Sequence, residues 1–274
     1  MNALRIPPFL NGDTRGLEKG ICKCSLLNRD CPWLDLVLSS GHSWDMEVFP
    51  SEGGESMYDK QKRVDLFPKM TVGVMGSAGG TLEEEVRLPV RRLGAAIARR
   101  GYVLITGACP GMPHEAVKGA KEQGGIVVGV SPALNLEEHA TRYHSPTRGY
   151  DAIIYTGSGL MGREVANIRS CDVVIFAGGR SGTLGEFAIA YDEAKVIGVL
   201  EGTGGITQHL KKIISFFKKD TGAVICYDAD PERLLDKLEQ VYRERILPRH
   251  LKVLEGRDPD GVLEPDVIGT EHMH

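Results

Sequence analysis

The sequence lacks several features that would assign it at once to a class of protein. It has no apolar run of 18 residues and no apolar stretch near its start, so neither a membrane span nor a signal peptide is predicted. Its 33 basic residues do not exceed its 37 acidic ones, which argues against the basic surface typical of nucleic-acid-binding proteins. Its six cysteines follow no regular spacing, so no disulfide framework is expected. We therefore expect a cytoplasmic protein without membrane or nucleic-acid partners.

Two nucleotide-binding signatures and a zinc signature are also missing or incomplete. No G-x-x-x-x-G-K-[ST] sequence is present, so a P-loop NTPase is not expected. Residues 157–162 match G-x-G-x-x-G, but the next predicted strand ends without the carboxylate that holds the ribose in a dinucleotide site. We interpret this match as coincidental. The cysteines at positions 22, 24 and 31 fit no standard zinc spacing, so no metal site is predicted.

From residue 67 onward, short apolar segments alternate regularly with amphipathic ones. We predict strands over residues 71–75, 102–106, 126–130, 152–155, 172–176, 196–200 and 223–227. We predict helices over residues 82–100, 113–123, 160–170, 183–195, 206–217 and 231–246, and a long loop over 131–150. This alternation predicts an α/β domain at 67–250, a doubly wound (Rossmann-like) parallel sheet of about seven strands. An irregular N-terminal extension (1–66) and a C-terminal tail (251–274) complete the expected organisation.

Glycine is in excess, with 34 in 274 residues against an average of about 7%. Many glycines follow predicted strands, at the edge where an open α/β sheet holds its ligand crevice. Glycine there lets backbone N–H groups approach an anion, and the helix behind adds its dipole. Tight turning alone would explain any one cluster, but four clusters at one edge favour a nucleotide-type site. These glycines are Gly76, Gly79, Gly80, Gly107, Gly111, Gly157, Gly159, Gly162, Gly178, Gly179 and Gly182.

The segment after the fifth predicted strand offers small residues, hydroxyl groups and the start of a helix. Glu186 lies about one turn into that helix, where its carboxylate would face the rim of a phosphate-binding loop. The other interpretation of Glu186 is a solvated carboxylate stabilised by the helix dipole. In the preceding helix, Arg163 and Asn167 are four residues apart and share a face. Arg169 points elsewhere, and we expect it to form an ordinary surface ion pair.

These residues resemble the LOG-type family of nucleoside 5′-monophosphate phosphoribohydrolases, formerly labelled lysine decarboxylases. They resemble still more closely the molybdenum-cofactor-carrier-like Rossmann proteins. The family pattern P-G-G-x-G-T-x-x-E is similar to residues 178–186, and the resemblance covers roughly residues 70–200. It implies catalytic roles for Arg163 and Glu186. It also implies a set of ligand-binding residues: Gly76, Ser77, Gly107, Gly111, Met112, Asn167, Gly178, Gly179, Arg180, Ser181, Gly182 and Thr183.

Two departures from the family pattern bear on function. Gly178 stands where the family has proline, and Arg180 stands where it has glycine. Arg180 would either donate to the ligand or fill the pocket, so the departures favour binding over hydrolysis. We therefore expect a carrier or sensor of a nucleotide or phosphorylated pterin, such as the molybdenum cofactor, with no further cofactor required.

The alternative is hydrolysis of a nucleoside 5′-monophosphate to free base and ribose 5-phosphate. In that reaction Glu186 would hold the ribose and orient the attacking water. No lysine lies in a context that suggests a pyridoxal Schiff base, so decarboxylation is rejected. The resemblance also implies a homodimer.

Overall fold

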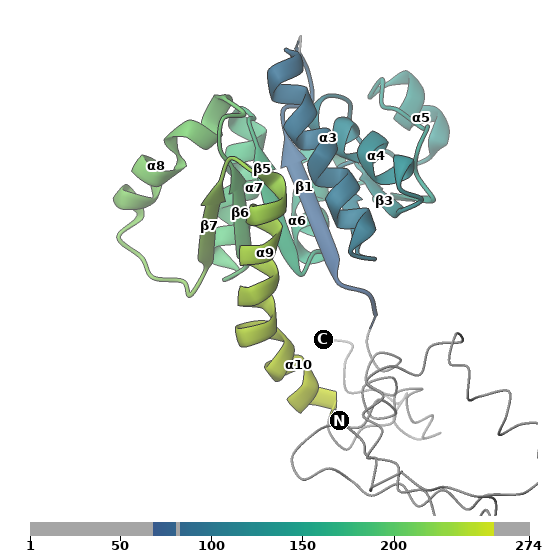
Figure 1. The fold of residues 1–274 in the computed structure, drawn as a ribbon. Coiled ribbons are helices and arrows are strands. Elements are labelled where there is room, and N and C mark those ends of the chain that lie inside the picture. Colours follow the sequence, from purple (N-terminus) through teal and green to yellow (C-terminus); the bar gives the residue numbers. More distant parts are fainter. Residues whose placement is uncertain (1–67, 81–82, 255–274) are drawn as a thin grey trace, which may run out of the picture. The chain divides into compact units, whose positions relative to one another are not determined.

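A seven-stranded parallel sheet forms the centre of the described part of the chain (Figure 1). The computed structural model of the protein describes residues 68–80 and 83–254. The strands are β1 (Thr71–Gly76), β2 (Val103–Thr106), β3 (Ile126–Ser131), β4 (Ala152–Tyr155), β5 (Val173–Ala177), β6 (Val196–Leu200) and β7 (Val224–Asp228). Their order is β4-β3-β2-β1-β5-β6-β7, and each neighbouring pair is parallel. The predicted doubly wound, Rossmann-like fold is confirmed.

Helices connect the strands and cover both faces of the sheet. They are α3 (Glu84–Arg99), α4 (Met112–Glu122), α5 (Leu136–Thr141), α6 (Gly159–Arg169), α7 (Ser181–Asp192), the 3-10 helix η1 (Gly205–His209), α8 (Leu210–Phe217), α9 (Pro231–Val241), the π-helical turn η2 (Tyr242–Ile246) and α10 (Leu247–Leu254). None of the helices in these residues is both long and apolar enough to cross a bilayer.

Three predicted segments differ from the structure. The predicted loop over residues 131–150 is wrong in part, because it contains α5. Asn135 caps this helix by accepting a hydrogen bond from the Glu138 N–H (2.9 Å), but six residues are too few to show helical periodicity. The predicted helix over 206–217 begins as the 3-10 turn η1, after two glycines with positive φ. The last predicted helix continues past residue 246 to Leu254.

Each face of the sheet has its own apolar core, which explains why the strands read as continuous apolar runs. In β5, Val173 and Ile175 belong to the core under α3, α4 and α9. Val174 and Phe176 point the other way, into the core under α6, α7 and α8. Phe176 packs edge-on against Phe187 of α7, with ring centroids 5.5 Å apart. The central strands are thereby fixed from both sides.

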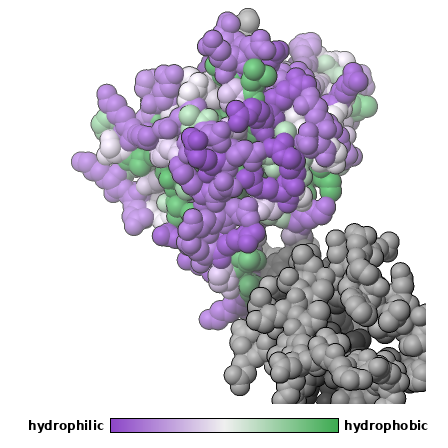
Figure 2. Space-filling view, in the orientation of Figure 1, coloured by the Kyte–Doolittle hydropathy of each residue, from purple (hydrophilic) through white to green (hydrophobic). Residues whose placement is uncertain are grey.

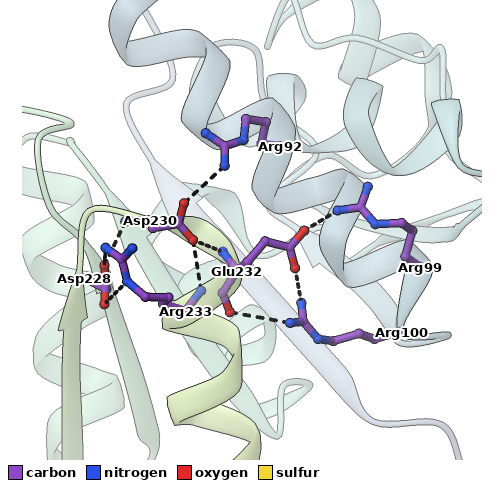
Figure 3. Close-up of polar contacts among 7 residues, drawn as sticks. All are labelled: Arg92, Arg99, Arg100, Asp228, Asp230, Glu232 and Arg233. Carbon is purple, nitrogen blue, oxygen red and sulfur yellow. Dashed lines mark hydrogen bonds and ion pairs between the residues drawn. The ribbon is translucent and has the colours of Figure 1, made fainter.

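Ion pairs connect α9 to α3, two helices that cover the same face of the sheet (Figure 3). Arg92 contacts Asp230 (3.1 Å), and Arg100 contacts Glu232 (2.9 Å). Asp230 also caps α9 by accepting hydrogen bonds from the N–H groups of Glu232 and Arg233. This side of the domain is largely hydrophilic, with only scattered apolar residues (Figure 2). Such exposed pairs each stabilise little, and we assign them the role of orienting α9.

The topology places the switch point, where open α/β sheets hold their ligand crevice, at the carboxyl ends of β1 and β5. The chain moves from β1 outward to β4 and then returns to place β5 on the other side of β1. In open α/β sheets, ligands bind at this switch point. A Cβ at Gly76 would lie only 2.1 Å from the carbonyl oxygen of Ala177, so the two strand ends approach closely. The literal G-x-G-x-x-G sequence follows β4 instead, at the edge of the sheet.

Candidate functional site

Two helices on one face of the sheet bring together the residues predicted to be catalytic. Arg163 and Asn167 lie on α6 and Glu186 lies on α7, and all three are less than 9% exposed. The Arg163 Nη1 and Glu186 Oε1 atoms are 3.7 Å apart. This distance allows charge attraction but is too long for a hydrogen bond. Of the two interpretations of Glu186 that the sequence allowed, the solvated carboxylate is therefore wrong, because the side chain is buried.

The position of Arg163 depends on a glycine at the end of β2. A Cβ at Gly107 would lie 1.8 Å from Nη1 of Arg163 and 2.7 Å from its Cζ. The guanidinium therefore occupies the space that any other side chain at position 107 would need. Gly107, predicted as a ligand-binding residue, shapes the site by admitting Arg163.

We expect Gly107→Ala to destabilise the protein by about 1–3 kcal/mol, because the new methyl group displaces a buried guanidinium. The same substitution in an Arg163→Ala background should cost at least about 1 kcal/mol less, because the clash is gone. Urea unfolding of the wild type, both single variants and the double variant measures this coupling. Equal costs in the two backgrounds would show that the close approach is not present in solution.

Burial changes the protonation of the acidic residues in this site. Burial is the largest cause that raises the pKa of Glu186, and the negative charge of Glu164 adds to it, whereas Arg163 and Asn167 lower it; the net result is a pKa of about 7. Burial also raises the pKa of Glu164, which Arg163 partly offsets. Carboxyl groups that titrate near neutral pH are found mainly at functional sites, although structural ion pairs also shift pKa values.

Two buried polar atoms at the site have no hydrogen-bond partner among the described residues. They are the Arg163 Nε, a donor, and the Asn167 Oδ1, an acceptor. The Asn167 amide nitrogen is satisfied, because it donates to the Met75 sulfur at 3.0 Å. Buried polar groups are nearly always paired, so each such atom requires an explanation. A bound molecule that offers one acceptor and one donor would satisfy both.

The loop between β5 and α7 has the geometry of an anion site. Gly178 and Gly179 both have positive φ (61° and 95°), and the Thr183 side chain occupies the space beside Gly179. The Gly178 N–H donates to the Thr203 hydroxyl at 2.9 Å, which holds the loop from behind. No side chain caps the N-terminus of α7, so its first backbone N–H groups remain available to an anion.

Arg180 lies at the mouth of the crevice and not inside it. It is exposed, and its Nη2 lies 3.5 Å from the position that a Cβ of Gly79 would take. The side chain therefore reaches from the β5–α7 loop to the β1–α3 loop, across the switch point. Of the two roles considered for Arg180, this position agrees with a charged donor at the rim.

The remaining predicted site residues lie in the loops around the crevice, with different roles. Ser181 and Gly182 are exposed at the start of α7. Gly111, with φ of 82°, packs on the Ser77 carbonyl, which accepts a hydrogen bond from the Met112 N–H (2.9 Å). Met112 itself is buried in the core, against the Gly178 backbone. These contacts join neighbouring loops.

Three residues near the candidate site were not predicted from the sequence, whereas the surface ion pair predicted for Arg169 is confirmed. Thr203 supports the loop from behind, Glu164 lies between α6 and α7, and Cys109 lies close enough to Arg163 and Glu186 for their charges to affect its pKa. Burial raises the pKa of the Cys109 thiol to about 11. Arg169 forms the predicted surface ion pair, with Glu193 at 2.7 Å.

The predictions about metals concern mostly residues outside the described part of the chain. The cysteines at positions 22, 24 and 31 all lie there. Within residues 68–80 and 83–254, no group of three or more histidine, cysteine, aspartate or glutamate side chains has a geometry that would hold a metal ion.

The fold is Rossmann-like, and the buried residues Arg163, Asn167 and Glu186 form its candidate ligand site. The chain belongs to the SLOG cluster4 family, whose sequence profile matches residues 69–235. It is 35% identical over 134 residues to an uncharacterized protein of Archaeoglobus fulgidus, covering 48% of this chain and 80% of that one.

Solved structures similar to the chain include the following three. The first, TM1055, is 27% identical, with a TM-score of 0.55, and the match covers 62% of this chain and 99% of TM1055. The molybdenum cofactor carrier protein of Chlamydomonas reinhardtii is 30% identical, with a TM-score of 0.53 and coverages of 64% and 99%. The molybdenum cofactor binding protein of Rippkaea orientalis is 29% identical, with a TM-score of 0.52 and coverages of 64% and 98%. The resemblance inferred from the sequence is confirmed, and these relatives support a ligand-binding Rossmann-like protein.

Proposed function

We propose that the protein binds a nucleotide or a phosphorylated pterin, such as the molybdenum cofactor, and acts as its carrier or sensor. The observation that carries this proposal is the pair of buried polar atoms without partners among the described residues, Arg163 Nε and Asn167 Oδ1, on α6. The two side chains contact Gly107 after β2 and Met75 of β1. Leaving such groups unpaired costs about 1–3 kcal/mol each, which a ligand would recover. The molybdenum cofactor proteins among the similar structures agree with this ligand class.

The parts of the crevice suit the parts of such a ligand. The phosphate would accept hydrogen bonds from the uncapped N-terminus of α7 and from Arg180 at the rim. The rest of the ligand would reach inward to Arg163, Asn167 and Glu186. Backbone N–H groups provide most of the phosphate-binding donors, so a protein of net charge −4 can still bind an anion here.

Native mass spectrometry of the purified protein, followed by calorimetry with GMP, AMP, ribose 5-phosphate and a pterin with a phosphorylated side chain, tests this proposal. We expect at least one of these ligands to bind stoichiometrically and to leave unchanged. Absence of binding by all four at millimolar concentration would refute it.

The same spectra report the number of subunits. We propose a homodimer, supported by exposed apolar side chains near β4 and the start of α6, namely Ile154, Leu160 and Met161.

One observation favours the hydrolytic alternative. Glu186 is buried beside Arg163 and has a pKa of about 7, which suits a group that activates water. In this reaction water would add to C1′ of the sugar through an oxocarbenium-like state, and the base would leave with a proton. Release of free base from AMP or GMP, abolished by Glu186→Gln, would establish it. Intact nucleotide after long incubation at high protein concentration would leave binding alone.

A further inference from the structure

Glu164 is a buried residue whose carboxylate makes no hydrogen bond to another described residue. It lies on α6 next to Arg163 and is only 6% exposed. Its Oε1 and Oε2 lie 3.5 and 3.2 Å from the positions that Cβ atoms of Gly182 and Gly185 would take, so the two glycines of α7 make room for it. The only group that offsets its burial is the charge of Arg163, and no hydrogen bond to a described residue does so.

Several acceptors lie at the site. Glu164, Glu186 and the Asn167 Oδ1 all accept hydrogen bonds, and the latter two are also buried. Among the described residues, Arg163 is the donor side chain whose charge acts on both carboxylates. An ionised carboxylate accepts several hydrogen bonds, and burying it without them is costly. A ligand that fits here must bring adjacent N–H or O–H donors together with one acceptor for the Arg163 Nε.

We propose that the Glu164 carboxylate accepts hydrogen bonds from the edge of a 2-amino-4-oxopyrimidine ring, which guanine and pterin share. This inference rests on the proposed function and specifies its ligand. The ring N–H and the 2-amino group are adjacent donors that one carboxylate can accept together, and the oxo group is an acceptor for the Arg163 Nε. Adenine has an acceptor nitrogen where guanine has its ring N–H. That nitrogen would face the carboxylate oxygens, which are also acceptors, and the two would repel. The site should therefore discriminate against adenine.

Ribose hydroxyl groups are the other donors that a carboxylate could accept, and they identify the control ligand. Ribose 5-phosphate keeps the sugar and phosphate but has no ring. IMP keeps the oxo group and the ring N–H of GMP but lacks the 2-amino group. Comparing these ligands separates recognition of the ring from recognition of the sugar.

Calorimetry at about pH 8, above the pKa of about 7 of Glu186, tests the proposal with wild type, Glu164→Gln and Glu193→Gln. Glu193 is a partly exposed carboxylate on the turn after α7 and serves as the matched control. Wild type should bind GMP at least about tenfold more tightly than IMP or AMP. Glu164→Gln should lose this preference and bind ribose 5-phosphate as wild type does. Glu164→Asp, which keeps the charge, should recover part of the preference.

Other outcomes overturn the inference in distinguishable ways. If the wild type binds AMP and ribose 5-phosphate but shows no preference for GMP, the ring inference fails while the proposed function stands. If Glu164→Gln weakens the binding of ribose 5-phosphate as much as the binding of GMP, Glu164 contacts the sugar and not the ring. If no phosphorylated ligand binds the wild type, both fail together. A phosphorylated pterin that binds more tightly than GMP, and loses as much affinity in Glu164→Gln, supports the inference. This result would identify pterin as the ring that the site binds. Thermal unfolding confirms that each variant is folded.

Discussion

Replacing Arg163 with methionine is expected to weaken binding of GMP, or of the tightest ligand found, by about 100-fold or more. Removing one partner of a buried, hydrogen-bonded charge pair typically costs 2–5 kcal/mol, and 1.4 kcal/mol corresponds to tenfold in affinity. Arg163 is 7% exposed and is the charge that stabilises both Glu186 and Glu164 in their ionised forms. Its loss therefore removes a donor to the ligand and leaves two buried carboxyl groups without a counter-charge.

Isothermal titration calorimetry measures this effect, and the same helix provides the control. Arg169 is exposed on α6 and paired with Glu193, so Arg169→Met should change the affinity by less than about twofold. Arg163→Lys should restore little, because lysine has no atom equivalent to the buried Nε and cannot fill the space above Gly107 in the same way. Tight binding by Arg163→Met would exclude the crevice as the binding site.

The fold could be predicted from the sequence because its signals are local and repeated. Apolar strands such as Thr71–Gly76 alternate with amphipathic helices, and only a parallel sheet covered on both faces accommodates that pattern. The errors occurred where a signal is short or misleading. The six residues of α5 are too few to show a period. Pro248 favours an end of the last helix near residue 246, but the π-helical turn at Tyr242–Ile246 precedes this proline and α10 continues to Leu254.

The site was less predictable, because burial and close approach depend on residues far apart in the sequence. The sequence left Glu186 open between a solvated carboxylate and a site residue, and only the packing of α6 on α7 shows it to be buried. Glu164 was not predicted to be a site residue. The signal that could have found it is the pair Gly182 and Gly185, three residues apart on one face of α7. Glycines at such spacing in a helix indicate that a side chain from a neighbouring element packs there.

In the absence of ligand, Glu186→Gln is expected to stabilise the protein increasingly as the pH rises from about 4.5 to 8. The pKa of Glu186 is raised from its ordinary value of 4.5 to about 7 in the folded protein, chiefly by burial. Between these values the folded protein holds a proton that the unfolded chain has released, so stability falls as the pH rises. The loss is complete above about pH 7 and amounts to about 3 kcal/mol.

Glutamine is neutral at every pH, so the variant does not suffer this loss. Below about pH 4.5 the two proteins should differ little, and near pH 8 the variant should be more stable by up to about 3 kcal/mol. Urea unfolding at several pH values measures the difference, and Glu193→Gln, which removes a partly exposed carboxylate nearby, should follow the wild type more closely. A difference between Glu186→Gln and wild type that is constant from about pH 4 to 8 would show that Glu186 is not buried as an acid.

The same experiment with ligand present connects stability to function. A carboxylate that destabilises the folded protein at neutral pH has no structural benefit that glutamine would not also provide, so its benefit must come from an interaction that the free protein lacks. If the ligand donates hydrogen bonds to Glu186, saturating ligand should lower the pKa of Glu186 and reduce the stability advantage of Glu186→Gln at about pH 8. A ligand that stabilises both proteins equally at that pH would show that it binds without contacting the carboxylate.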